Sequence, residues 1–497
     1  MRKWTTAILI SGGLGVAGGC IIPKSDCEWD NTCNGSSSGG TDSGSDVKPD
    51  ITPPGCDPTK DPKDNVECVV NSFGVFIDGA GGNDQNDGSK EKPVKTFKTA
   101  LSKLGNKSRL YVCAGSYGER VELTSAISIY GGFACGTWTY AASNKVTIAP
   151  QEAGVALTLK NGGADPVAFQ DIEVKAAPGA AAGDSSIAAS VADSASVSFA
   201  RARLEAGEAV DGQTVPVAPF AWDASNLPVN GQIPLGATPN TGGIGGKLTC
   251  PGGAVTEGGV GGNNKIGQYD GQLGSPGGGP GGPGGTACTG GTDAVQPGVA
   301  PEASPASSLG KAEAGAWLAA APAAGRTGAP GGGGGGGGAK DGEGGGGGGG
   351  SGGCGGAGGG GGLAGGSSIA LVSFNAGLRV ADSVLLAKAG RAGGSGAVGQ
   401  DGDTRFGQFT LVLTQSCNGG RGARGGKGGA GAGGAGGLSV GVLYKGTAPK
   451  LEGTTDANIT IGAPGSKGPG GGAGNDGPKG RAAKVLATEP DGTVKPE

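Results

Sequence analysis

A stretch of 23 residues that recurs along the chain constrains the fold most strongly. Residues 185–207 carry the same pattern of small and apolar residues as residues 367–390, and a looser copy begins at Gly437. Ser185 and Ser367 are 182 residues apart, and removing the 159 glycine-rich residues 208–366 leaves a step of 23. Ser367 and Gly437 are 70 apart, and removing the 46 residues 391–436 leaves 24. Two unequal insertions thus leave one coil length, which predicts a solenoid whose long loops leave from the same corner.

Large apolar residues recur at matching places inside these copies. The equivalent sets are Phe169, Val174 and Ala176; Phe199, Leu204 and Ala206; and Val380, Leu385 and Ala387. We expect each set to stack on the next inside the solenoid, where each large side chain contributes about 1.5–3 kcal/mol. Leu385→Asp should therefore prevent folding, whereas Ser383→Asp should be tolerated. The first positions of the copies, Ile187, Ile369 and Leu438, should lie in consecutive turns.

Short β-prone segments account for most of the remaining apolar sequence. A first strand is expected within residues 69–77, and residues 93–104 place Phe97, Ala100, Leu101 and Leu104 on one face of a helix. Further strands are expected at 145–149, 155–159, 167–174, 187–191, 196–204, 369–374, 378–386, 409–413, 438–443 and 459–461. The pattern indicates an all-β chain with one elongated core.

The segment from Asp78 to Phe133 carries a family resemblance. An Asp-Gly-Ser turn at residues 87–89 precedes a Pro-led helix, a strand, a Gly-Ser-Tyr turn and the sequence Ile-Ser-Ile-Tyr-Gly-Gly-Phe at residues 127–133. This order resembles the entry segment of right-handed parallel β-helix proteins of the pectin-lyase-like superfamily. The resemblance implies a right-handed parallel β-helix with coils of about 22–24 residues and an N-terminal capping helix. It covers some 55 residues and implies no particular catalytic residue, because the clustered Asp ligands and Arg or Lys base of the polysaccharide lyases are not found.

The N-terminus reads as a lipoprotein leader. Two basic residues precede a short apolar run, and the run ends at Ala17-Gly-Gly-Cys20. Small residues directly before Cys20 resemble a bacterial lipobox, which implies lipidation of Cys20. Ile21 behind the cysteine implies the outer membrane. The alternative is an ordinary cleaved signal with a chance cysteine, since the run is too short to span a bilayer.

The cysteine count agrees with an oxidising extracytoplasmic compartment. Of 11 cysteines, ten remain once Cys20 is set aside, which permits five disulfides. Proximity alone suggests Cys27 with Cys33, Cys56 with Cys68, and Cys113 with Cys135. The other four lie in the glycine-rich insertions, where bridges would most reduce the entropy of the open chain. Metal binding is the rival, but no CxxC pair exists.

Composition limits the chemistry that the chain can perform. It has no His, and its formal charge of −4 gives no reason to expect nucleic-acid binding. Asn83 to Asp87 could hold Ca²⁺, although a turn held by side-chain to backbone hydrogen bonds is favoured. Asp165, Asp171 and Glu173 are candidates for paired catalytic carboxylates. The early aromatic residues suggest end-cap packing rather than a sugar platform. They are Tyr111, Tyr117, Tyr130, Phe133, Trp138 and Tyr140.

Glycine recurs at every third residue in five runs. They span 325–337, 344–365, 390–402, 419–437 and 462–480, while residues such as Arg421, Arg424 and Lys427 vary between the glycines. A polyproline II chain has three residues per turn, so this period leaves one face without side chains for close packing. The period is similar to the polyglycine II layers of certain antifreeze proteins and phage tail-tip adhesins, and the composition resembles the PE-PGRS proteins without their PE module. Disordered linker is the alternative.

Together these features predict an outer-membrane or cell-surface lipoprotein built on a β-helix. The expected parts are a leader (1–19), a flexible tether (20–68), the first coils (69–207), insertions at 208–366 and 391–436, coils at 367–390 and 437–461, and a glycine-rich tail (462–497). The leading function is structural or adhesive, without enzymatic activity, cofactor or metal, with an extracellular glycan or another surface protein as partner. The alternatives are a carbohydrate-binding or polysaccharide-cleaving β-helix and, third, an ice-binding protein.

Overall fold

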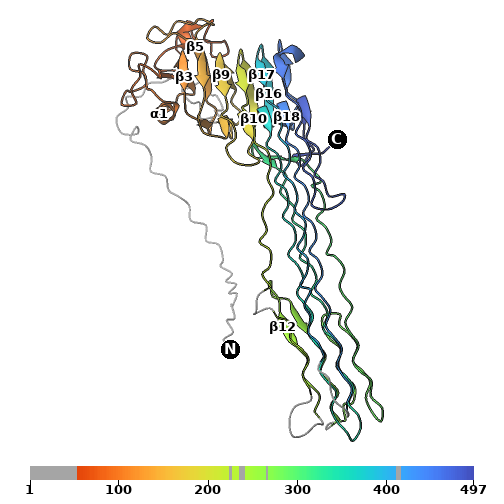
Figure 1. Cartoon of the computed structure of the whole chain (residues 1–497). Coiled ribbons are helices and arrows are strands. Elements are labelled where there is room, and N and C mark those ends of the chain that lie inside the picture. Colours follow the sequence, from red (N-terminus) through yellow and green to blue (C-terminus); the bar gives the residue numbers. More distant parts are fainter. Residues whose placement is uncertain (1–52, 223–226, 234–240, 265–266, 410–415) are drawn as a thin grey trace, which may run out of the picture. The chain divides into compact units, whose positions relative to one another are not determined.

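The computed structural model describes residues 53–222, 227–233, 241–264, 267–409 and 416–497, and all structural statements below concern these residues. Within them the chain is nearly all β, with its two main sheets paired in parallel. Figure 1 shows the strands following one another in chain order across the stack. The helical turns are η2 (Val66–Cys68), α1 (Phe97–Ser102) and η5 (Asp456–Asn458).

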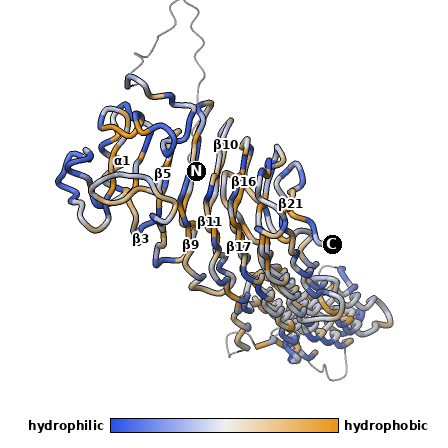
Figure 2. The backbone as a smooth tube through the Cα atoms, turned by 90° about the horizontal axis from the view of Figure 1, so that it is seen from above, coloured by the Kyte–Doolittle hydropathy of each residue, from blue (hydrophilic) through white to orange (hydrophobic). Residues whose placement is uncertain are grey.

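Two parallel sheets face one another, and Figure 2 shows them as two rows of strands. The first sheet contains β1 (Val75–Ile77), β2 (Arg109–Cys113), β4 (Val121–Leu123), β5 (Ser128–Phe133), β7 (Val155–Leu159), β8 (Val167–Gln170), β10 (Ser186–Ala200), β16 (Ser368–Ala381), β18 (Ser439–Lys445), β19 (Lys450–Glu452) and β21 (Ala482–Ala487). The second contains β3 (Gly115–Tyr117), β6 (Val146–Ile148), β9 (Ile172–Lys175), β11 (Arg203–Glu205), β17 (Val384–Leu386) and β20 (Ile459–Thr460).

The sequence copies lie in register as neighbouring strands. Ile187 pairs with Ile369, as the 182-residue offset predicts, and Leu204 pairs with both Val174 and Leu385. Phe199 likewise pairs with Phe169 and Val380. The third copy was misplaced, because Ile369 pairs with Val440 and not with Leu438, so the true offset is 71 residues. Glycine and small residues around position 437 gave no apolar landmark to fix that register.

Residues with left-handed backbone divide strands that the sequence presents as continuous. Asp171, Arg201 and Asp382 have φ of 55°, 53° and 46° and separate β8 from β9, β10 from β11, and β16 from β17. The expected strands 167–174, 196–204 and 378–386 are therefore each broken at one corner. Such backbone is rare outside glycine, and Asp adopts it more readily than most residues.

The main core lies between the two sheets and contains the predicted ladders. Phe199, Leu204 and Leu385 are fully buried there. The tolerance expected for Ser383→Asp does not fit the structure, because Ser383 is 1% exposed. Its hydroxyl donates to the carbonyl of Ala381 at 2.7 Å and accepts the backbone N–H of Ala202 at 3.1 Å.

Two small antiparallel units interrupt the regions expected to be only glycine-rich. One hairpin joins β12 (Lys247–Thr249) to β13 (Val255–Glu257). The other consists of β14 (Gly310–Glu313) and β15 (Ala316–Ala319), and β14 also pairs with β22 (Thr493–Val494). Trp317 of β15 packs in an apolar cluster with Ile369 and Val440, so this unit covers the outer face of the first sheet. The expected tail 462–497 also supplies β21, the last strand of that sheet.

The N-terminal end of the core is covered by α1 and by the segment before it. Thr96 caps α1 by accepting the N–H of Thr99 through its hydroxyl. The segment from residue 53 onward, expected to belong to the flexible tether, is packed: Asp61 pairs with Arg201 at 3.0 Å, and Arg109 donates to the carbonyl of Pro58 at 2.9 Å. The remainder of the predicted tether and the leader lie outside the described residues.

The glycine-rich segments between residues 208 and 480, apart from the two small antiparallel units, pack side by side as extended chains; we call them the glycine bundle (Figure 1). Gly350 donates its N–H to the carbonyl of Gly420 at 3.0 Å, and Gly420 donates to Gly335 at 2.7 Å. Residues 344–357 are all buried because other segments surround them. The disordered-linker alternative is therefore wrong for these described segments. The run 462–480 folds back at Gly474 instead of continuing as one extended chain.

Candidate functional site

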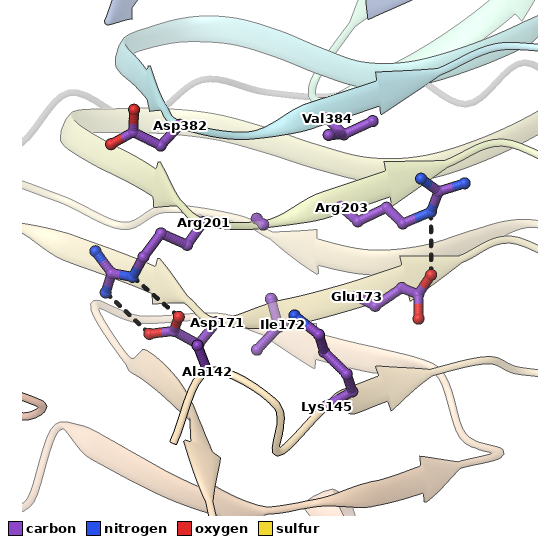
Figure 3. Close-up of a pocket in the computed structure, with 10 residues that line it drawn as sticks. Ala142, Lys145, Asp171, Ile172, Glu173, Arg201, Arg203, Asp382 and Val384 are labelled. Carbon is purple, nitrogen blue, oxygen red and sulfur yellow. Dashed lines mark hydrogen bonds and ion pairs between the residues drawn. The ribbon is translucent and has the colours of Figure 1, made fainter. Parts of the chain in front are cut away.

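A cleft of about 440 Å³ lies on the outer side of the second sheet, and Figure 3 shows its side chains. The strands β9, β11 and β17 form its floor, and charged residues of both signs line it. The lining residues are Ala142, Lys145, Asp171, Ile172, Glu173, Arg201, Ala202, Arg203, Asp382 and Val384.

The repeat places these charges together. Asp171, Arg201 and Asp382 occupy the left-handed corner of successive coils, so their side chains emerge along one edge of the cleft. Glu173 and Arg203 are direct partners in the β9–β11 register, so both side chains emerge on one face of the sheet.

Arginine neutralises the candidate carboxylates of the cleft. Arg201 donates to both oxygens of Asp171 at 2.9 Å, and Arg203 lies 3.1 Å from Glu173. The burial of Arg201 opposes its charge, but the hydrogen bonds and ion pairs with Asp171 and Asp61 outweigh it and raise the pKa of the guanidinium. Asp165, the third candidate, is exposed and does not line the cleft. The cleft therefore offers ion-paired, hydrogen-bonding groups that suit polar binding.

Most of the early aromatic residues are buried. Tyr111, Tyr130, Phe133 and Trp138 belong to one apolar cluster. Their rings contact one another, with the Tyr111 and Phe133 centroids 5.9 Å apart and perpendicular. The fully buried ring of Phe97 meets Tyr117 edge-on. Only Tyr140 reaches the edge of the cleft, where its hydroxyl donates to Asp171 at 3.0 Å. The rings thus act as packing at the N-terminal end, as the sequence favoured.

The turn around residues 83–87 is held by side-chain to backbone hydrogen bonds. Asn83 Oδ1 accepts the N–H of Gln85 at 3.0 Å, and Asp87 Oδ1 accepts the N–H of Ser89 at 2.9 Å. Asp84 accepts the N–H groups of Lys95 and Thr96, both at 3.0 Å. These bonds match the favoured reading and use the oxygens that a cation would need.

Four disulfides join the described cysteines. Cys56–Cys68 and Cys113–Cys135 are the two described pairs that proximity suggested, whereas Cys27 and Cys33 lie outside the described residues. Cys250–Cys354 and Cys288–Cys417 cross-link the glycine bundle. The one cluster of potential metal ligands in the described part of the chain is Asp78, Cys113 and Cys135, and its sulfurs are consumed by their disulfide.

A second hollow lies on the flank of the glycine bundle, and the sequence did not indicate it. Trp222, Gln400, Asp401, Gly402, Asp403, Thr404 and Arg405 line it. Asp403 is 2% exposed and receives a bidentate hydrogen bond from Arg405. A lone Trp inside a glycine-rich insertion was the available signal, but nothing in the sequence places it beside residues some 180 positions later.

Comparisons with known proteins give no relative. No family model, curated protein or solved structure matches the chain. Among the described residues, none of the helices has the length and apolar character needed to cross a membrane. With several disulfides, the chain is consistent with an oxidising compartment outside the cytoplasm.

Proposed function

We propose that the chain is a non-enzymatic cell-surface protein, structural or adhesive, that presents the glycine bundle to its surroundings. The observation that carries this proposal is the lateral hydrogen bonding of the glycine segments. Each bundle segment donates backbone N–H groups to neighbouring segments, as Gly353 does to Ala423 at 2.9 Å and Ala423 does to Gly332 at 2.9 Å. A bundle tied in this way is stiff, and it leaves only its outer side chains available for contact.

We further propose that the two parallel sheets are the walls of a right-handed parallel β-helix. The in-register stacking of Phe169, Phe199 and Val380, and of Val174, Leu204 and Leu385, supports this proposal. Each coil would contribute one strand to each sheet, with the glycine insertions leaving after β11 and β17.

Attachment through a lipid on Cys20 to the outer membrane completes the proposal. The lipobox-like sequence and the four disulfides support it. Cells expressing the full chain should incorporate radiolabelled palmitate into it, and Cys20→Ser should abolish the label. Added protease should degrade the protein on intact cells. An unlabelled, freely secreted product would refute the anchor.

Adhesion is tested with the same cells. Those displaying the full chain should remain on a surface coated with extracellular polymer under flow, while cells displaying Gly350→Ala, which disturbs bundle packing, should detach. Equal retention of both, or retention no greater than that of cells without the protein, would remove the adhesive role.

The cleft on the second sheet supports a second candidate, a carbohydrate-binding β-helix. Its Arg, Lys and carboxylate side chains converge on one volume, which is what recognition of a hydroxyl-rich ligand requires. Binding of neutral oligosaccharides that is lost in Arg203→Ala would favour this candidate over the structural role.

A further inference from the structure

One flank of the glycine bundle carries a row of basic side chains, Arg421, Arg424 and Lys427, here called the basic ladder. Exposure along residues 421–429 repeats every third position, with these three exposed and the six residues between and after them buried. In a polyproline II chain the period of three brings each exposed side chain to the same face, about 9 Å further along. In the described glycine segments no other run places basic residues at three successive exposed positions.

The basic ladder adjoins the hollow that contains Trp222. Gly425 donates its N–H to the carbonyl of Asp403 at 3.0 Å, so the ladder segment and the hollow segment are neighbours. Lys427 forms an ion pair at 3.2 Å with Asp401, which lines the hollow. The ladder and the hollow therefore form one continuous surface.

The balance of charge on this surface is positive. Asp403 is neutralised by Arg405, and Asp401 by Lys427. Arg421 lies 5.5 Å from the ring centroid of Phe409, and its backbone N–H donates to Asp293, the remaining nearby carboxylate. Arg424 adds a further charge. This concentration contrasts with the net charge of −4 of the whole chain.

Trp222 gives the hollow an apolar wall. Gln400 fixes the segment that carries this ring, because its amide accepts the N–H of Phe220 and donates to the carbonyl of the same residue, both at 2.8 Å. Trp222 packs against Leu248 and against the Cys250–Cys354 disulfide, so its indole is only half-buried and keeps a fixed position. An indole beside carboxylate and guanidinium groups provides stacking for a sugar ring and hydrogen bonds for its hydroxyls.

We propose that this flank binds an acidic polysaccharide, with the basic ladder contacting successive carboxylates and Trp222 stacking on one sugar ring. Regularly spaced cations suit a polymer with regularly spaced anions better than a single small ligand. Single-stranded nucleic acid is less suitable, because it is bound by several stacked aromatic side chains and this hollow offers one. The inference depends on the proposed function in taking the bundle flank as the surface that meets the partner.

The test uses the full-length protein in non-ionic detergent and alginate, a polyuronate, as the probe, with EDTA present. We expect saturable binding that weakens steeply as NaCl is raised from about 50 to 500 mM, and no binding of neutral dextran. Combining Arg421→Gln, Arg424→Gln and Lys427→Gln should reduce the affinity at least tenfold. Trp222→Ala should reduce it several-fold without changing the salt dependence.

The matched control removes the same number of charges elsewhere. Lys92, Lys95 and Lys98 are exposed around α1, and changing all three to Gln should leave alginate binding unchanged. Equal loss in both triple variants, or no loss in the ladder variant, would overturn the proposal. Equal or tighter binding of oligo-dT would also overturn it in favour of a nucleic-acid site.

The two proposals fail in different ways. If cells displaying the chain adhere but the ladder variant adheres equally well, the polysaccharide site is wrong and the adhesive role stands. If alginate binds in solution while the protein is absent from the cell surface, the role at the surface is wrong and the site stands.

Discussion

Gly350 and Gly420 are joined by a backbone hydrogen bond of 3.0 Å, although they lie on segments that follow different coils of the core. A Cβ built on Gly350 would come within 2.0 Å of the carbonyl oxygen of Gly407. The closeness of three chains at this point explains why the interior segment has glycine at consecutive positions, where the period of three alone would require only one in three.

Gly350→Ala should therefore destabilise the bundle. Forcing backbone segments apart in a closely packed region costs about 1–3 kcal/mol. Chemical denaturation of the full chain measures the loss, and Gly298→Ala is the matched control, because a Cβ at Gly298 meets no atom within 4 Å. Equal stability of the two variants would show that the bundle does not pack as described.

Leu385→Asp and Ser383→Asp should both destabilise the core, contrary to the expectation from sequence. Leu385 is fully buried, and Ser383 is 1% exposed with its hydroxyl bonded on two sides. A carboxylate in either place would be buried without a cation, which costs more than about 4 kcal/mol. Ser196→Asp, on an exposed position of β10, should leave the denaturation midpoint unchanged. A stable Ser383→Asp protein would contradict the burial of that corner.

Cys250→Ser combined with Cys354→Ser should cost more stability than the same change at Cys56 and Cys68. The first bridge closes a separation of 104 residues and the second one of 12. Chain entropy gives about 4.7 kcal/mol for a loop of 100 residues and about 3 kcal/mol for one of 15. Denaturation of the two double variants compares them, and the opposite order would mean that the bundle segments stay together without the bridge.

Asp84→Asn should lower stability at neutral pH and matter less in acid. Burial opposes ionisation of Asp84, but the N–H groups of Thr96 and Lys95 and the hydroxyl of Thr96 outweigh it and hold its pKa below the ordinary 3.8. A depressed pKa stabilises the fold above the ordinary value, and this contribution is lost as the pH falls through the lowered pKa. The gap in melting temperature between the two proteins should narrow from pH 7 toward pH 2.

The same variant tests the calcium alternative at this turn. Because the oxygens of Asp84 accept N–H and O–H groups, adding Ca²⁺ should not change the melting temperature of the native chain. A rise with Ca²⁺ that Asp84→Asn removes would establish a cation site there.

Repetition made the central part of the fold predictable. The copies containing Leu204 and Leu385 share both length and apolar positions, so their pairing follows from counting residues. The break at Asp171 was not predictable, since only its φ of 55° distinguishes a corner from a continuous strand. The hairpin around Trp317 was hidden within a region whose composition is dominated by glycine.

The candidate sites were less accessible from sequence because they depend on long-range contacts. Asp171 and Glu173 were noticed as acidic residues, but their pairing with Arg201 and Arg203 arises only when successive coils stack. Trp222 is separated from Arg405 by most of the two insertions. No local pattern indicates that the folded bundle brings them to one hollow.

The register of the first sheet continues into the glycine bundle. Ser368 pairs with Ser439, and a Cβ on Gly422 or Gly425 would touch the carbonyl of Ser351 or Cys354, so the offset is 71 residues in both. A deletion of one residue in either segment would rotate every later position by a third of a turn and point side chains inward. Only triplets, removed together from neighbouring segments, would leave the lattice intact, so natural variants of this bundle should differ in length by whole turns.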